Sequence, residues 1–166
     1  MIVALRVDDR LIHGQVALAW SKELRIKGII VANDAAAQDE MQKMTLKMAV
    51  PDSIKLLIKS VDDAIGVANN PKVAKMRILL LTRNIKDALK IRENTENIEY
   101  VNIGNVGRFD GIDASEKTMV SPTVMLTKDE IDSLKKLIEI DSSTSLQAVP
   151  SDERKPMKDI VQKMNL

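Results

Sequence analysis

Short, continuously apolar runs alternate along the chain with longer stretches whose apolar residues recur at helical spacing. The clearest runs are Met1–Val7, Gly28–Ala32, Ile54–Ile58 and Arg77–Leu81. Strands without polar alternation are typical of parallel sheets covered on both faces, and right-handed crossovers place helices on either side. The pattern therefore predicts an α/β fold, a three-layer sandwich around a mainly parallel sheet of about seven strands.

Three further strands complete the predicted sheet, at Ile98–Ile103, Lys117–Val120 and Ser145–Val149. The predicted helices are Gly14–Leu24, Ala35–Val50, Val61–Ala68, Ile85–Glu93, one opened by Thr127 and a short one from Pro156. No linker, repeat or low-complexity segment divides the chain, so residues 1–166 are predicted to form a single domain.

Three methionines share one face of the predicted helix Ala35–Val50. Met41, Met44 and Met48 recur at helical spacing. Because Met fills irregular gaps in hydrophobic cores, we predict that this stripe packs into the core.

The composition of the chain argues against several classes of function. The chain has 25 Lys+Arg against 24 Asp+Glu and only three aromatic residues, so neither a basic patch nor a stacking surface points to nucleic acid. The absence of Cys excludes disulfides and thiolate chemistry. Leu11–Ser21 is far shorter than the roughly 20 apolar residues of a spanning helix, and the start lacks signal-peptide features. We expect a cytoplasmic protein that begins near Met1.

The search for a site begins at the strand ends, because ligands of open α/β sheets bind beyond the carboxyl ends of the strands. The first strand is followed by Asp8, Asp9, Arg10 and His13, the only histidine of the chain. Gly14 and Gln15 then open the next helix, whose first N–H groups and partial positive charge favour an anion. We predict an anion site beside an imidazole.

Such a site suits a phosphoryl group on the imidazole. A neutral imidazole is a nucleophile near pH 7 because its unperturbed pKa is about 6.5. Arg10 can clamp phosphate oxygens in a bidentate manner, and Asp9 can orient either the ring or Arg10. Arginine and backbone amides can carry the phosphate charge, so we expect neither a metal nor a cofactor.

Other readings of these residues stay open. Thr82 and Arg83 follow the fourth strand and either reach the same phosphate or belong to a helix cap with a solvated arginine. A serine–histidine–aspartate triad lacks a nucleophile-elbow pattern, and the glycines from Gly104 to Gly111 match no phosphate-binding loop. His13 itself can be read as an ordinary hydrogen-bonded loop residue.

The segment RVDDRLIHGQV, Arg6 to Val16, resembles the phosphorylation-site motif of the IIB components of bacterial sugar phosphotransferase systems, mannose/fructose/sorbose class. The motif is long and unusual. The resemblance continues in four segments, ILLLTRN at 78–84, VNIGNVG at 101–107, LTKDE at 126–130 and LQAVPSD at 146–152.

This resemblance implies a phosphocarrier with the same α/β sandwich. His13 would receive a phosphoryl group on Nδ1 from the phosphohistidine of a IIA protein. It would pass the group to a sugar of the mannose, fructose, sorbose or amino-sugar class, held by the membrane IIC and IID components. Arg10 matches the motif arginine that holds the phosphate, and Asp9 matches the acidic residue beside it. We therefore expect peripheral association with the transporter, and IIA on another chain.

Two departures from the family pattern concern loops. Ile140–Ser145 lacks a glycine-led turn, which affects local geometry, and Arg108-Phe109-Asp110 stands where smaller residues are expected. The second loop borders the expected partner surface, so it bears on partner choice. Arg10, Arg83 and Arg108 are a hypothetical positive rim against an acidic IIA surface.

The sequence leaves two alternative functions open. In one, the protein is a regulatory binding module whose phosphorylated His13 controls a partner without onward transfer to sugar. In the other, it binds a small anion or nucleotide without covalent modification. The sugar, the oligomeric state and the role of Asn105 are left open by the sequence.

Overall fold

The computed structural model describes residues 1–166 except for the side chains of residues 15 and 16. A seven-stranded sheet has the order β3-β2-β4-β1-β5-β8-β9. Its strands are β1 (Ile2–Asp8), β2 (Gly28–Ala32), β3 (Lys55–Lys59), β4 (Ile78–Thr82), β5 (Val101–Asn105), β8 (Ser145–Leu146) and β9 (Lys155–Pro156). Neighbours pair in parallel apart from β9, which runs antiparallel to β8.

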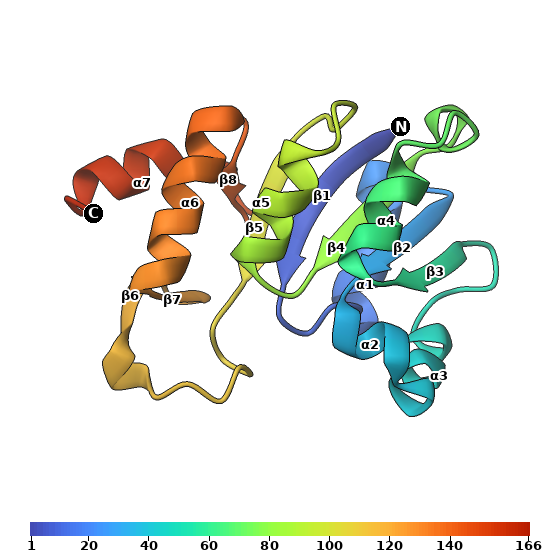
Figure 1. Ribbon diagram of the computed structural model, residues 1–166, viewed down its shortest axis with the longest axis horizontal. Helices are drawn as coiled ribbons and strands as arrows, with labels where there is room; N and C mark the ends of the chain where they lie inside the picture. Colours follow the sequence, from blue (N-terminus) through green and yellow to red (C-terminus); the bar gives the residue numbers. More distant parts are fainter.

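Helices cover both faces of this sheet, and α4 and α5 lie in front of the strands in Figure 1. The helices are α1 (Gly14–Leu24), α2 (Asp34–Gln38), α3 (Glu40–Met48), α4 (Val61–Ala68), α5 (Ile85–Glu93), α6 (Lys128–Ile140) and α7 (Met157–Lys163). One buried cluster joins the sheet to α4–α7, and a second joins it to α1–α3. The predicted α/β sandwich is confirmed.

The strand predicted at Lys117–Val120 does not join the main sheet. It forms β6 (Lys117–Ser121), which pairs antiparallel with β7 (Val124–Thr127), a strand that the sequence pattern did not reveal. The last predicted strand is also shorter, because β8 ends at Leu146 and the following Gln147 and Ala148 carbonyls accept hydrogen bonds from Arg6.

The helix predicted over Ala35–Val50 is divided in two at Asp39. This residue is extended, and its Oδ1 accepts hydrogen bonds from the Met41 and Gln42 N–H groups, so it ends α2 and caps α3. Asn33 caps α2 in the same way, since its Oδ1 accepts a hydrogen bond from the Ala36 N–H at 2.9 Å.

The prediction that the methionine stripe fills the core is wrong. Met41, Met44 and Met48 are 79%, 64% and 83% exposed, whereas Leu46 on the opposite side of α3 is buried. Helical spacing shows that residues share a face of the helix, but it does not show whether that face packs against the core or lies in solvent. Because of the break at Asp39, α3 has a direction of its own, and it turns Leu46 inward.

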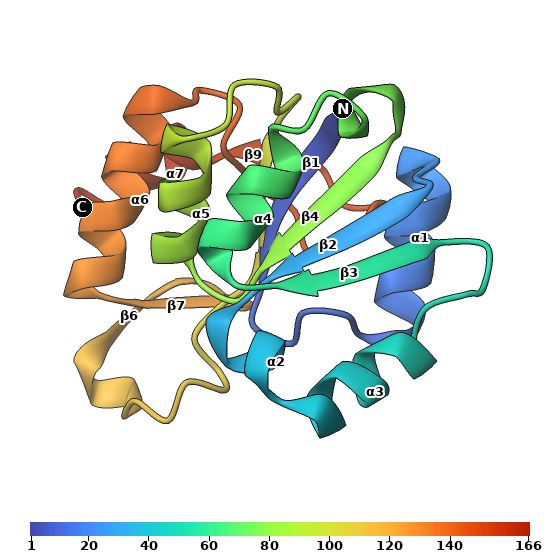
Figure 2. The same cartoon turned by 45° about the vertical axis from the view of Figure 1, so that its right-hand side comes forward.

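The parallel strands bring several chain segments to one edge. Val7 of β1 pairs with Thr82 of β4, and Asp8 pairs with Asn105 of β5, so the loops after these strands emerge together (Figure 2). Across the described part of the chain, no helix has both the length and the apolar character needed to cross a bilayer.

Candidate functional site

His13 is the N-cap residue of α1. Its backbone is extended, and its carbonyl accepts the first helical hydrogen bond from the Ala17 N–H at 3.1 Å. The side chain is exposed and forms no capping hydrogen bond within the described residues. Gly14 follows with φ +32° and with open space where a Cβ would stand. The imidazole therefore lies at a helix N-terminus, where α1 favours negative charge.

Asp8 shapes the turn that leads to this helix. Its Oδ1 accepts a hydrogen bond from the Arg10 N–H at 3.1 Å, and its carbonyl accepts one from the Leu11 N–H at 2.9 Å. Leu11 adopts φ +58°, a conformation that non-glycine residues rarely adopt. The hydrogen bonds on Asp8 hold the chain in this tight turn.

Arg10 is oriented by the same carboxylate. Its Nε lies 3.5 Å from Asp8 Oδ1, and its side chain is 29% exposed. Among the described residues Nε has no hydrogen-bond acceptor, so the contact with Asp8 is an ion pair. The guanidinium thus stays within the His13 loop and keeps donors for an anion.

Asp9 makes different contacts from Asp8. It is buried, and its Oδ2 accepts a hydrogen bond from the Arg108 N–H at 2.9 Å, which joins the β1–α1 loop to the loop after β5. Burial raises the pKa of the Asp9 carboxyl, although the Arg108 hydrogen bond lowers it. Asp8, not Asp9, therefore forms the ion pair with Arg10. The sequence placed Asp8 at the end of the first strand but indicated no role for it.

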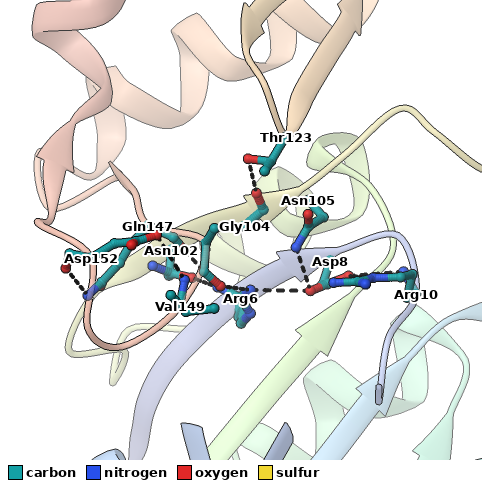
Figure 3. A network of polar contacts seen from close by, with 11 residues as sticks. Arg6, Asp8, Arg10, Asn102, Gly104, Asn105, Thr123, Gln147, Val149 and Asp152 are labelled. Atoms are coloured by element: carbon teal, nitrogen blue, oxygen red, sulfur yellow. Dashed lines mark hydrogen bonds and ion pairs between the residues drawn. The ribbon is translucent and has the colours of Figure 1, made fainter. Parts of the chain in front are cut away.

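A buried arginine lies beside Asp8 and contacts its carboxylate (Figure 3). Arg6 Nη2 lies 3.2 Å from Asp8 Oδ2, and Asn105 Nδ2 donates to the same oxygen at 3.2 Å. Burial lowers the pKa of Arg6, and the charge of Asp8 opposes that shift. The carboxylate that shapes the His13 loop is thus held by two buried donors, and Asn105, whose role the sequence left open, is one of them.

The guanidinium of Arg6 also binds the chain at two more distant places. Its Nη1 donates to the Gln147 carbonyl at 2.9 Å and to Asn102 Oδ1, and its Nη2 donates to the Ala148 carbonyl at 2.8 Å. The Trp20 ring of α1 lies under it, 4.7 Å from Cζ. These contacts tie β1, β5, the segment after β8 and α1 together.

The remaining predicted residues lie apart from this cluster. Thr82 is fully buried, and its hydroxyl donates to the Asn84 carbonyl at 3.2 Å. Arg83 is half-buried, and its Nε has no acceptor among the described residues. Asn84 caps α5 through the Asp87 N–H at 2.8 Å, so this segment has the geometry of a helix cap. The side chain of Gln15 lies outside the described residues.

Arg108, the third arginine of the hypothetical rim, is exposed, and its Nη2 donates to the Pro122 carbonyl at 2.7 Å. Within the part of the chain that the structure describes, no three histidine, cysteine or carboxylate side chains gather as metal ligands. The chemistry of the cluster is that of an exposed imidazole, an oriented guanidinium and the first amides of α1.

Known proteins resemble this chain over nearly its whole length. A probable phosphotransferase enzyme IIB component of Streptococcus pyogenes is 43% identical over 97% of this chain and 99% of that protein. The sorbose-specific EIIB component of Lacticaseibacillus casei is 34% identical over 99% and 96% of the two chains. The mannose-specific EIIAB component of Escherichia coli is also 34% identical over 99% of this chain, which spans half the length of that relative.

A solved structure agrees with these sequence relatives. The crystal structure of the IIBSor domain of the sorbose permease from Klebsiella pneumoniae superposes with a TM-score of 0.88, covering 98% of this chain and 97% of that one at 29% identity. The family model for the sorbose subfamily IIB component of the phosphotransferase system matches residues 2–166. The chain therefore belongs to the sorbose subfamily of phosphotransferase-system IIB components, phosphotransferases that act as phosphocarriers in sugar uptake.

Proposed function

We propose that His13 is the residue that carries the phosphoryl group. It receives the group from the phosphohistidine of a IIA protein and passes it to a sugar held by the membrane IIC and IID components. The observation that carries this proposal is the exposed His13 side chain at the N-terminus of α1, four residues after Asp9 and three after the oriented Arg10.

The first step is an in-line displacement between two imidazoles. A ring nitrogen of His13, Nδ1 by the family resemblance, forms a bond to phosphorus as the P–N bond of the donor breaks. His13 loses one proton in this step and the donor imidazole gains one, so the exchange is balanced. Arg10 and the first amides of α1 stabilise the phosphate oxygens, whose charge dominates such a transition state.

The second step returns His13 to its starting state. A hydroxyl oxygen of the sugar attacks phosphorus, the P–N bond of phosphorylated His13 breaks, and the hydroxyl proton balances the one that the imidazole regains. The same guanidinium and helix terminus serve both steps, because the phosphate leaves from the place where it arrived. Gly14 keeps this approach free of a side chain.

The partners follow from the family. The Escherichia coli relative is named EIIAB, and this chain matches half of it, which supports a IIA protein as the donor. Relatives named for mannose, sorbose and fructose support a sugar of this class as the acceptor. In this proposal the protein works in the cytoplasm and binds the membrane components at their inner side.

A reconstituted relay tests the proposal. The full chain is incubated with phosphoenolpyruvate, Enzyme I, HPr and IIA proteins of the mannose class. Membranes containing IIC and IID are then added with mannose, fructose, sorbose or N-acetylgalactosamine. We expect sugar phosphate with the wild type and none with His13→Ala, whose fold is checked by circular dichroism. Equal sugar phosphate from His13→Ala contradicts the proposal, and a phosphorylated His13 that never yields sugar phosphate favours the regulatory alternative.

A further inference from the structure

We propose that Phe109, with Ile112 beside it, is the apolar anchor on which the phosphohistidine-bearing IIA donor docks next to His13. The proposal rests on the function proposed above and goes beyond it by naming a docking element and its chemistry. The two residues belong to the loop Gly107–Ile112, called the anchor loop below.

Phe109 is the only phenylalanine of the chain, and it is 66% exposed. Ile112, three residues on, is also exposed. A single exposed apolar residue is common on protein surfaces and needs no explanation. What distinguishes Phe109 is that the backbone presenting it is fixed at several points.

The first fixed point is the β1–α1 loop. Asp9 Oδ2 accepts the hydrogen bond from the Arg108 N–H at 2.9 Å. The Asp9 N–H in turn donates to the Asn105 carbonyl at 2.8 Å. The anchor loop is therefore attached to the segment that carries His13.

The second fixed point is a buried lysine. Lys117 Nζ donates to the Gly107 carbonyl at 2.5 Å and to Asp110 Oδ1 at 2.6 Å, with only 2% of its side chain exposed. Asp110 Oδ1 also accepts a hydrogen bond from the Ile112 N–H at 3.0 Å. Burial raises the pKa of Asp110, but the Lys117 and Ile112 hydrogen bonds outweigh it, so the net shift is downward and the carboxylate stays ionised.

The base of the loop is fixed by close packing on β7. Gly107 has φ +94°, and a Cβ there would lie 2.0 Å from the Met125 carbonyl oxygen. Val106 accepts a hydrogen bond from the Met125 N–H at 2.9 Å. Because both ends and the middle of the loop are held, Phe109 loses little conformational freedom when a partner covers it. Anchors of this preorganised, aromatic kind dominate many interfaces.

The charge around the loop favours a soluble partner. A hollow of about 310 Å³ beside Ile112 is lined by the carboxylates of Asp87, Asp110, Asp129 and Glu130, with Lys86 as its cation. The cytoplasmic surface of a membrane is negatively charged and repels carboxylates. The anchor loop therefore fits the soluble donor better than a transporter at the membrane surface.

The test compares two ways of phosphorylating the full chain. Initial rates are measured with phosphorylated IIA over a range of concentrations, and separately with phosphoramidate, a small donor that needs no docking surface. Phe109→Ala and Phe109→Ala/Ile112→Ala are the test variants. Met119→Ala is the matched control, because Met119 is 60% exposed on β6 and outside the anchor loop.

We expect Phe109→Ala to raise the KM for phosphorylated IIA about tenfold or more, as loss of an interface anchor does. The phosphoramidate rate stays at the wild-type value, and Met119→Ala behaves as wild type with both donors. A wild-type KM in Phe109→Ala overturns the inference. An equal loss of phosphorylation rate with phosphoramidate also overturns it, because Phe109 would then maintain the shape of the His13 loop. A loss confined to sugar transfer overturns it as well, because Phe109 would then contact the membrane components. A wild type that takes no phosphoryl group from IIA overturns the proposed function itself.

Discussion

Arg6 and Asp8 form a buried ion pair on β1, with Nη2 and Oδ2 3.2 Å apart and both side chains 2% exposed. Residues two apart on a strand point to the same side, which lets neighbours in the sequence pair directly. The second oxygen of Asp8 binds the Arg10 backbone. One buried carboxylate therefore links the positive charge inside the sheet to the arginine beside His13.

Asp8→Asn tests this link through stability. The substitution leaves the Arg6 charge buried without its counter-charge, which costs about 3–5 kcal/mol when a buried pair is broken. We expect a loss of this size in the free energy of unfolding, measured by urea denaturation. Asp52→Asn, at an exposed turn, is the control and should change it by less than about 0.5 kcal/mol. A near-neutral Asp8→Asn would show that Arg6 does not depend on this carboxylate.

Gly104→Ala tests the space that Arg6 occupies. A Cβ at this position would lie 2.2 Å from Arg6 Nη2, so the guanidinium must leave its acceptors. We expect a destabilisation of about 1–3 kcal/mol, typical of overpacking, and a smaller effect in the Arg6→Met background. Gly66→Ala, on α4 with open space around it, should stabilise the protein by about 0.5–1 kcal/mol. Additive effects of the Gly104 and Arg6 substitutions would rule out the clash.

The raised pKa of Asp9 predicts a pH-dependent stability. Between the ordinary value of 3.8 and the higher folded value, the folded chain keeps a proton that the unfolded chain has released. The contribution of Asp9 to stability therefore falls as the pH rises through this window, and is constant above it. Asp9→Asn keeps an acceptor for the Arg108 N–H but does not titrate. Denaturation of both proteins from pH 3 upward should show the wild type losing stability relative to Asp9→Asn, and parallel curves would refute the assignment.

The two sides of α3 should respond differently to truncation. Leu46→Ala removes a buried side chain and should cost about 2–5 kcal/mol, whereas Met44→Ala on the exposed side should change the free energy of unfolding by less than about 0.5 kcal/mol. Thermal unfolding of both variants measures the difference. A large loss in Met44→Ala would mean that the methionine stripe is covered in solution.

The sequence predicted elements best where local chemistry decides them. The apolar runs of β1, β2 and β4 give buried parallel strands, and Thr127 with Glu130 forms the capping box that opens α6. It failed where hydrophobic periodicity alone was followed. The capping hydrogen bonds of Asp39 to the Met41 and Gln42 N–H groups interrupt a helical pattern, and β6 and β7 pair across a short turn between Ser121 and Val124.

At the candidate site, the residues near His13 could be predicted from the sequence, but the contacts that position them could not. His13, Gly14 and Arg10 follow from a strand end, a glycine and a helix start, all visible in the sequence. Asp8 is held by Arg6 of its own strand and by Asn105 of β5. Asp9 instead binds the Arg108 N–H in the loop after β5, and these contacts across the fold are not visible in the sequence. A strand-end position also does not distinguish an exposed hydroxyl from a buried one, and the Thr82 hydroxyl is buried.

The most direct test of the account is to locate the phosphoryl group. The full chain is phosphorylated by IIA, digested at alkaline pH to preserve phosphohistidine, and mapped by mass spectrometry, with an acid-treated portion in parallel. The account predicts one phosphoryl group per chain, on the peptide that contains His13, lost in acid and absent from His13→Ala. An acid-stable group, or one on a peptide without His13, would contradict it.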